Sequence, residues 1–262
     1  LSFSTTTHTL TYTPSSSPQA AMTKIPFSVF GTGNYLDITI SPMTMSDSRN
    51  YFANGAVQSG TYNYKVVKLA TSYLTAENLR TTQYNDNSNI SEITDNTAWT
   101  TTMSGAYCKY DNSNSNGNDY GLLYNGPAVG YNVLTSLWNG DRLAPSGWRA
   151  TLGTTSSYDW KRIFEYLGTE ASDAAGGKLK AEGTTLWNSP NSGSTNIALF
   201  HAVANGNRLG DTGLFGDLGT FGYIWGAGAN SFNYLQHSTS ELKSTSGVLF
   251  IRTGRAVLCV KV

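Results

Sequence analysis

Hydrophobic and polar residues alternate over many short stretches of this chain, which is the pattern of half-buried β-strands. Near the start, "IPFSVFGTGNYLDITI" predicts a hairpin, in which residues 25–29 alternate, "GTGN" turns the chain and residues 36–40 alternate back. After residue 180, short strands alternate with Gly and Asn turns, as in "ALFHAV", "FGYIW", "YLQH", "VLFIR" and "AVLCVKV". These two parts of the chain are therefore predicted to form short strands.

Two stretches have helical spacing instead. Residues 157–167 place four apolar side chains on one face, at Trp160, Ile163, Phe164 and Leu167, and Ser156 with Asp159 has the spacing of a capping box. Residues 128–138 also have helical spacing, with Gly140 as the stop. Two helices followed by a run of short strands predict an α+β fold.

The composition and the residue pattern of the sequence change near residue 61. Residues 1–60 are rich in Thr and Ser and have strand patterning, but they hold too little apolar mass to fold alone. We therefore expect residues 1–60 to be a β-rich attachment or oligomerisation segment and residues 61–262 to be a separate domain.

The composition argues against nucleic-acid-binding and membrane proteins. Only 13% of the residues are charged, and the 17 basic residues balance 17 acidic ones, so the chain lacks the charge expected for binding nucleic acid or an anionic membrane. No run of 18 apolar residues exists, so no membrane span is expected, and the first residues lack the pattern of a signal peptide. The chain is rich in Ser, Thr, Asn and Gly and has 16 tyrosines. This composition is typical of extracellular β-rich proteins and also of binding surfaces.

Known catalytic and metal-binding patterns are missing from the sequence. The three histidines form no close ligand pair, and no G-x-S-x-G, Walker or dinucleotide-binding motif occurs. "NSNSNGND" has the spacing of a calcium loop, but amides replace its carboxylates and Leu123 stands at the twelfth position, which favours a solvated turn. We expect no cofactor, no metal and no catalysis. A hydrolase with an unrecognised site and a structural surface protein remain alternatives.

The segment "NYLQHSTSELKSTSGVLFIR", residues 233–252, mixes aromatic and polar side chains without a nucleophile–base pair. We predict that residues 225–252 form an exposed recognition face, with Trp225, Phe232, Tyr234 and Phe250 as aromatic anchors and Asn230, Gln236, His237, Glu241 and Arg252 as polar contacts. The alternative is that the aromatic residues are core and the polar residues are merely solvated.

The order of several motifs resembles a known family. "YKVVKL", "TAENLRTTQYND", "APSGWRATL", "DWKRIFEYLG", "GNRLGDTGLFGDLGTFGYIW" and "AVLCVKV" occur in the order of the Fibrobacter succinogenes major paralogous domain family, which is abundant in Bacteroidetes. The resemblance covers residues 61–262. It implies a C-type-lectin-like fold of two helices, short twisted strands and long loops.

The resemblance also implies functional features. Ala144 stands where the family has a cysteine, which leaves Cys108 and Cys259 as the only possible disulfide, and such folds bring their two ends together. Altered motifs in the last 40 residues are also the pattern of variable proteins of diversity-generating retroelements, which are often phage receptor-binding tips. The resemblance thus implies a non-catalytic, extracellular ligand-binding or adhesion protein at a cell surface or on a virion, such as a tail-fibre tip or pilus adhesin. Its partner would be a cell-surface protein or glycan, with assembly into an oligomer, fibre or pilus through residues 1–60.

Overall fold

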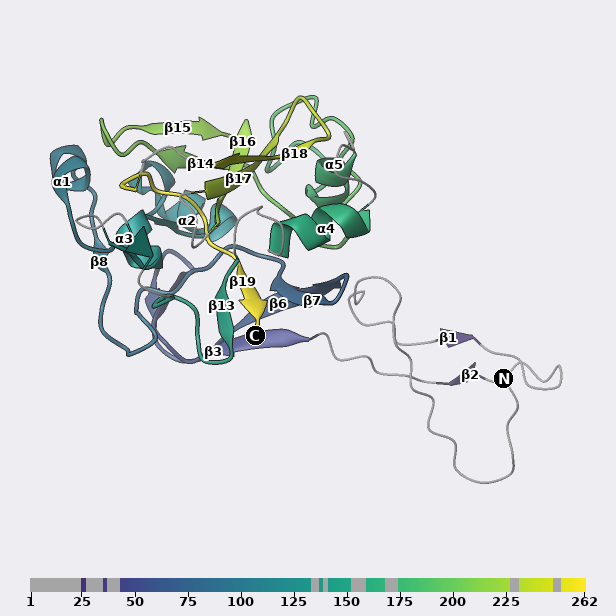
Figure 1. Ribbon diagram of the computed structural model, residues 1–262, viewed down its shortest axis with the longest axis horizontal. Helices are drawn as coiled ribbons and strands as arrows, with labels where there is room; N and C mark the ends of the chain where they lie inside the picture. Colours follow the sequence, from purple (N-terminus) through teal and green to yellow (C-terminus); the bar gives the residue numbers. More distant parts are fainter. Residues whose placement is uncertain are drawn as a thin grey trace, which may run out of the picture.

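The computed structural model describes residues 25–26, 35–36, 43–132, 137–138, 141–151, 159–167, 174–226, 231–246 and 251–262. Two five-stranded sheets organise this part of the chain (Figure 1). The first has the order β13 (Trp148–Ala150), β19 (Cys259–Lys261), β7 (Ser72–Thr75), β6 (Tyr62–Leu69) and β3 (Thr44–Asp47), and it is antiparallel throughout.

The second sheet has the order β15 (Phe215–Leu218), β14 (Asn205–Arg208), β16 (Phe221–Gly226), β17 (Ser231–Gln236) and β18 (Leu242–Ser246). Its neighbours are antiparallel except for β14 and β16, which run parallel. The smaller sheets are β10 (Leu123–Tyr124), β9 (Ala106–Cys108) and β8 (Ser91–Glu92), and the pairs β4 (Tyr51–Ala53) with β5 (Ala56–Gln58), β11 (Tyr131–Asn132) with β12 (Leu137–Trp138), and β1 (Ile25–Pro26) with β2 (Tyr35–Leu36).

The helices of the described chain are short. They are α1 (Asn96–Thr101), α2 (Asn114–Tyr120), α3 (Gly126–Val129), α4 (Asp159–Leu167) and α5 (Ala175–Leu179), with a 3₁₀ turn at Tyr110–Asn112. In Figure 1, α4 and α5 lie beside the β14–β18 sheet. Among the residues that the structure describes, no helix has the length and apolarity to cross a membrane.

The largest hydrophobic cluster joins the two five-stranded sheets to α4 and α5. It contains Leu74 of the first sheet, Ile224 and Leu235 of the second, Trp160 of α4 and Leu179 of α5. The amphipathic stripe predicted for residues 157–167 is confirmed, because Trp160, Ile163 and Leu167 are all buried there. Helix α4 therefore exists because its apolar stripe has a sheet to cover.

The predicted α+β fold with two helices on a strand-poor sheet, the C-type-lectin-like arrangement, is wrong. Among the described residues, strand residues outnumber helical residues about twofold, 36% against 18%. The second helix expected at residues 128–138 is replaced by the four-residue α3, which ends at Gly130 in the left-handed conformation, φ 112°. The chain then forms the β11–β12 hairpin, Tyr131 pairing with Trp138. A glycine that adopts a positive φ easily stops the helix before its apolar spacing can take effect.

The expected boundary at residue 60 also falls inside a packed unit. Strand β3 pairs with β6 through Met45 and Tyr64, and both of these side chains are buried, as is Phe52. Residues 43–60 thus belong to the domain. Of the hairpin predicted at residues 25–40, the described residues pair Ile25 with Leu36 and Pro26 with Tyr35, which leaves eight residues between the strands instead of the four of "GTGN". The rest of residues 1–42 lies outside the described residues.

The asparagine-rich segment is a helix rather than a loop. Ser113 caps α2 by accepting a hydrogen bond from the backbone of Asn116, and the buried Gly117 packs against Phe52 and Lys109. The expectation of a solvated turn was wrong because Ser113 supplies a helix cap and Gly117 lets the helix approach its neighbours. Among the described residues no cluster of His, Cys, Asp or Glu could hold a metal ion.

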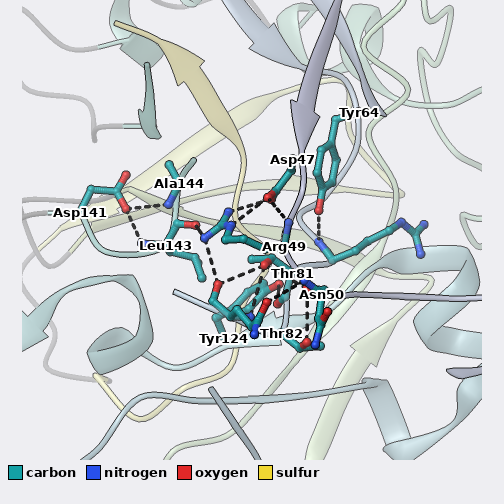
Figure 2. Close-up of polar contacts among 12 residues, drawn as sticks. Asp47, Arg49, Asn50, Tyr64, Thr81, Thr82, Tyr124, Asp141, Leu143 and Ala144 are labelled. Carbon is teal, nitrogen blue, oxygen red and sulfur yellow. Dashed lines mark hydrogen bonds and ion pairs between the residues drawn. The ribbon is translucent and has the colours of Figure 1, made fainter. Parts of the chain in front are cut away.

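A buried ion pair fixes β3 to two distant loops (Figure 2). Arg49 binds Asp47 through two nitrogens, at 2.7 and 2.8 Å, and donates to the carbonyl oxygens of Gln83 and Leu143 at 2.9 and 2.7 Å. Burial lowers the pKa of Arg49, but the hydrogen bond and charge of Asp47 outweigh it and raise that pKa above its usual value. This fully paired cluster ties residues 47–49 into the domain core.

Candidate functional site

Strands β16 and β17 carry four aromatic rings on one face of the second sheet. Their antiparallel register places Tyr223 opposite Tyr234, with Phe221 two residues before Tyr223 and Phe232 two residues before Tyr234. Because side chains alternate along a strand, the four rings share one face, which we call the aromatic face. All four are half-buried.

The opposite side of the same strands is core. Ile224 and Leu235, which alternate with the rings, are buried in the largest hydrophobic cluster. The sheet therefore has one packed side and one side on which aromatic rings keep part of their surface in solvent. Burial of such rings is favourable, so a cluster of four rings that keeps part of its surface in solvent is a candidate functional site.

The rings support one another. Neighbouring centroids lie 5.3 to 6.1 Å apart, with Phe221 and Tyr223 stacked at 11° and Tyr223 and Phe232 edge to face at 70°. The Tyr223 hydroxyl donates to Asp217 Oδ2 at 2.9 Å. Burial and this hydrogen bond raise the pKa of Tyr223, so the hydroxyl stays protonated at neutral pH. The arrangement is a pre-ordered platform.

A buried arginine lies at one end of the aromatic face. Arg255 is 4% exposed, and its Cζ lies 4.0 Å from the ring centroid of Phe232 and 4.4 Å from that of Trp225. Its Nε is buried without a hydrogen-bond partner, and the described chain gives its guanidinium no carboxylate. Its backbone is held by pairing with Tyr124.

Of the residues predicted for the recognition face, some lie with the aromatic rings and others do not. Phe232, Tyr234 and, by the same alternation, Gln236 lie on the side of β17 that carries the rings, as expected. Trp225 is 7% exposed, packs in the core and donates from Nε1 to the carbonyl of Tyr124 at 2.8 Å, so its predicted role as an exposed anchor is wrong.

The polar residues predicted for this face are dispersed. His237 Nδ1 contacts the carbonyl of Ser189 at 2.9 Å, beyond the end of β17. Glu241 forms an ion pair with Lys243. Arg252 Nε donates to the carbonyl of Thr102 at 3.1 Å, so this side chain reaches the segment that follows α1 rather than the rings. Asn230 and Phe250 lie outside the described residues.

The predicted disulfide is absent from the structure. Cys108 and Cys259 are both free and fully buried. They lie in different hydrophobic clusters, Cys108 with Trp99 and Leu123, and Cys259 with Val257. Burial raises the pKa of the Cys108 thiol to about 12 and that of Cys259 well above its usual value, so neither is poised to react.

A cavity of about 540 Å³ lies on the other side of β16 from the aromatic face. Its wall is mainly apolar and includes Val67, Phe200 and Ile224, while its ionisable residues are Lys65, Glu77, Arg80, Asp119, Tyr120 and His201. Several of these are already engaged: Glu77 accepts from the Tyr62 hydroxyl at 2.8 Å and from the Lys65 amide at 2.9 Å. Burial, then the charge of Lys65, lowers the pKa of His201.

The model of the Fibrobacter succinogenes major domain matches residues 67–257. The chain belongs to this family. The match contains the whole aromatic face, Arg255 and the cavity wall from Val67 onward, so the family resemblance seen in the sequence is confirmed. No curated protein and no solved structure matches the chain.

In this member of the Fibrobacter succinogenes major domain family, the structured unit extends beyond the matched residues on both sides. Strand β3 at residues 44–47 and strand β19 at residues 259–261 complete the first sheet. Sequence reasoning missed three residues of the site: Phe221 and Tyr223, whose alternation in "FGYIW" could have revealed them, and Arg255, for which the sequence carries no signal.

Proposed function

We propose that the protein is a non-catalytic ligand-binding or adhesion protein that uses the aromatic face as its recognition surface. The observation that carries the proposal is the cluster of Phe221, Tyr223, Phe232 and Tyr234, partly exposed on a sheet whose other side is core. Rigid aromatic side chains provide contact area at a small cost in conformational entropy. A fixed sheet presents them without any rearrangement on binding.

The setting that we propose is extracellular, at a cell surface or on a virion, as in a tail-fibre tip or a surface or pilus adhesin. The near-neutral, charge-poor composition and the abundance of hydroxyl and amide side chains support it. The ligand would be a cell-surface protein or glycan. Residues 1–42, which precede the packed domain, would attach the protein to an oligomer, fibre or pilus.

The test is a glycan and protein array probed with the full chain. For a ligand found there, Tyr234→Ala and Phe232→Ala should each weaken binding by about 1–3 kcal/mol, because each removes a ring from the platform. Tyr166→Ala is the matched control, since this tyrosine is 43% exposed on α4. Equal affinity in all three variants would contradict the proposal.

The cavity supports a second candidate function, an enzyme with an unrecognised site. The observation in its favour is an apolar pocket that carries His201 and Glu77 at its wall. A broad hydrolase panel run beside the array tests it. Turnover of any substrate that is lost in His201→Ala would favour this candidate over the aromatic face.

Light scattering tests the attachment role of the N-terminal residues. The full chain should form a larger species than a chain that begins at residue 43, which keeps every strand of the first sheet. Identical monomers in both cases would rule out self-association through residues 1–42.

A further inference from the structure

Arg255 differs from every other buried cation of the described structure. The others are each paired: Arg49 with Asp47, Lys109 with Glu92, Lys180 with the carbonyls of Ser192, Gln236 and Thr239, and Arg208 with Asn96 and the carbonyls of Ile93, Thr94 and Gly213. Among the described residues, the Arg255 guanidinium lies over the rings of Trp225 and Phe232, and its Nε has no hydrogen-bond partner. An unpaired buried charge is costly, so this arginine is not explained by stability.

The pKa of Arg255 reflects the same isolation. Burial lowers it to about 9, with the neighbouring Tyr223 acting in the opposite direction. The group is therefore still cationic at neutral pH. It is a buried positive charge beside Tyr223 and Phe232, two of the four rings of the aromatic face.

We propose that Arg255 is the anion-binding residue of the aromatic face and that the ligand is a sugar acid, a pyranose ring that carries a carboxylate. This inference rests on the proposed function and specifies its ligand. The planar guanidinium offers paired N–H donors that match a carboxylate, and a desolvated site strengthens that pairing. The apolar side of the sugar ring stacks on the neighbouring aromatic rings.

An acidic peptide offers the same carboxylate, but the site suits it less. Peptides gain much of their affinity by adding a strand to a free sheet edge. Strands β16 and β17, which carry the rings, have neighbours on both sides, β14 and β18, so neither offers a free edge to a peptide. Flat rings without free backbone donors favour a ring-shaped ligand.

The experiment compares binding of the full chain to trigalacturonate and to its methyl ester, in which the same sugar lacks the charge. A second pair, 3′-sialyllactose and lactose, distinguishes a sialic acid from a uronic acid. The wild-type protein should bind one of the two acids at least about tenfold more tightly than its neutral counterpart, which corresponds to about 1.4 kcal/mol. Poly-glutamate peptide tests the peptide alternative.

Variants then assign the preference to one side chain. Arg255→Met should abolish the preference for the acid and leave weak binding of the neutral sugar. Arg252→Met is the matched control, because this arginine lies three residues away and reaches Thr102 instead of the rings; it should keep the preference. Arg255→Lys should lower the preference for the acid over the neutral sugar to a few-fold. This variant replaces Arg255→Met in the test if the methionine variant does not fold.

Stability separates this role from a structural one. Arg255→Met should melt at or above the wild-type temperature, because it removes an unpaired buried charge. A marked loss of stability in Arg255→Met, with the full wild-type acid preference in Arg255→Lys, would show that the arginine only packs between the rings.

The outcomes separate this inference from the proposed function. Equal binding of acid and neutral sugar, with both lost in Tyr234→Ala, overturns the sugar-acid inference and leaves the aromatic face as the binding surface. Binding of poly-glutamate without binding of either acid also overturns it. Loss of acid binding in Arg255→Met but not in Tyr234→Ala supports Arg255 as the anion-binding residue and contradicts the proposed aromatic face.

Discussion

Replacing Lys180 with methionine should destabilise the protein although the two side chains have similar size. Lys180 is fully buried, and its Nζ donates to the carbonyl oxygens of Ser192, Gln236 and Thr239 at 2.8, 3.0 and 2.8 Å. The ammonium also lies 5.3 Å from the centroid of the Trp187 ring. One cation therefore holds the loop around residue 192 against the turn that joins β17 to β18.

Two opposing terms set the size of the effect. Three partly buried carbonyls lose a donor, at about 1–3 kcal/mol each. Against this, methionine removes the cost of burying a charge, and the lowering of the Lys180 pKa by burial from 10.5 to about 8 makes that cost about 3 kcal/mol. Because bonds from a charged donor are at the strong end of the range, the net loss should be about 3 kcal/mol, or roughly 6–12 °C in Tm.

Thermal and urea unfolding at pH 7 measure this loss, with Lys65→Met as the control because Lys65 is exposed. A decrease in Tm no larger than that of the control would refute the reasoning. The pH dependence adds a second criterion. Between pH 8 and about 10 the folded protein loses the Lys180 proton while the unfolded chain keeps it, so the wild type gains stability over the variant, by up to about 1.4 kcal/mol per pH unit. Below pH 8 the difference should be constant.

Three further predictions follow from the fold. Neither cysteine should react with a thiol reagent in the native protein at pH 8, and both should react after unfolding; no reaction after unfolding would indicate a disulfide between them that the structure lacks. Asp47→Asn should cost about 3–5 kcal/mol in a urea titration because Arg49 keeps a buried charge without its carboxylate, and a loss below 1 kcal/mol would contradict this. Deleting residues 1–42 should leave the melting temperature of the domain unchanged, whereas deleting residues 1–60 removes β3 and should lower it strongly.

The sequence predicted those elements whose local pattern and tertiary environment agree. Helix α4 was found because Trp160, Ile163 and Leu167 repeat at helical spacing and are buried together. The similar spacing of Val129 and Leu137 failed because the intervening Gly130 turns the chain. Periodicity describes which residues could share a face, but not whether the backbone continues to the next turn.

The candidate site was predictable only in part. Alternation in β17 placed Tyr234 correctly, since a strand puts every second residue on the same side. The neighbouring ring of Tyr223 depends on which strands pair and in what register, and that pairing is a property of the tertiary fold. Arg255 joins the face from a separate segment, and its lack of a partner becomes visible only when its surroundings are known.

The place of β19 in the first sheet has a consequence for how the protein is made. This strand lies between β13 and β7, where Val260 pairs with Leu74 and the Cys259 amide bonds to the Thr75 hydroxyl, 184 residues earlier. During synthesis, β3, β6 and β7 can pair as soon as they leave the ribosome, but the edge of β7 stays open until β19 emerges. The sheet should therefore close only after translation of nearly the whole domain, and slowly, because such distant contacts must be found after a large loss of chain entropy. Nascent chains of this protein should accordingly depend on chaperones that cover an exposed strand edge.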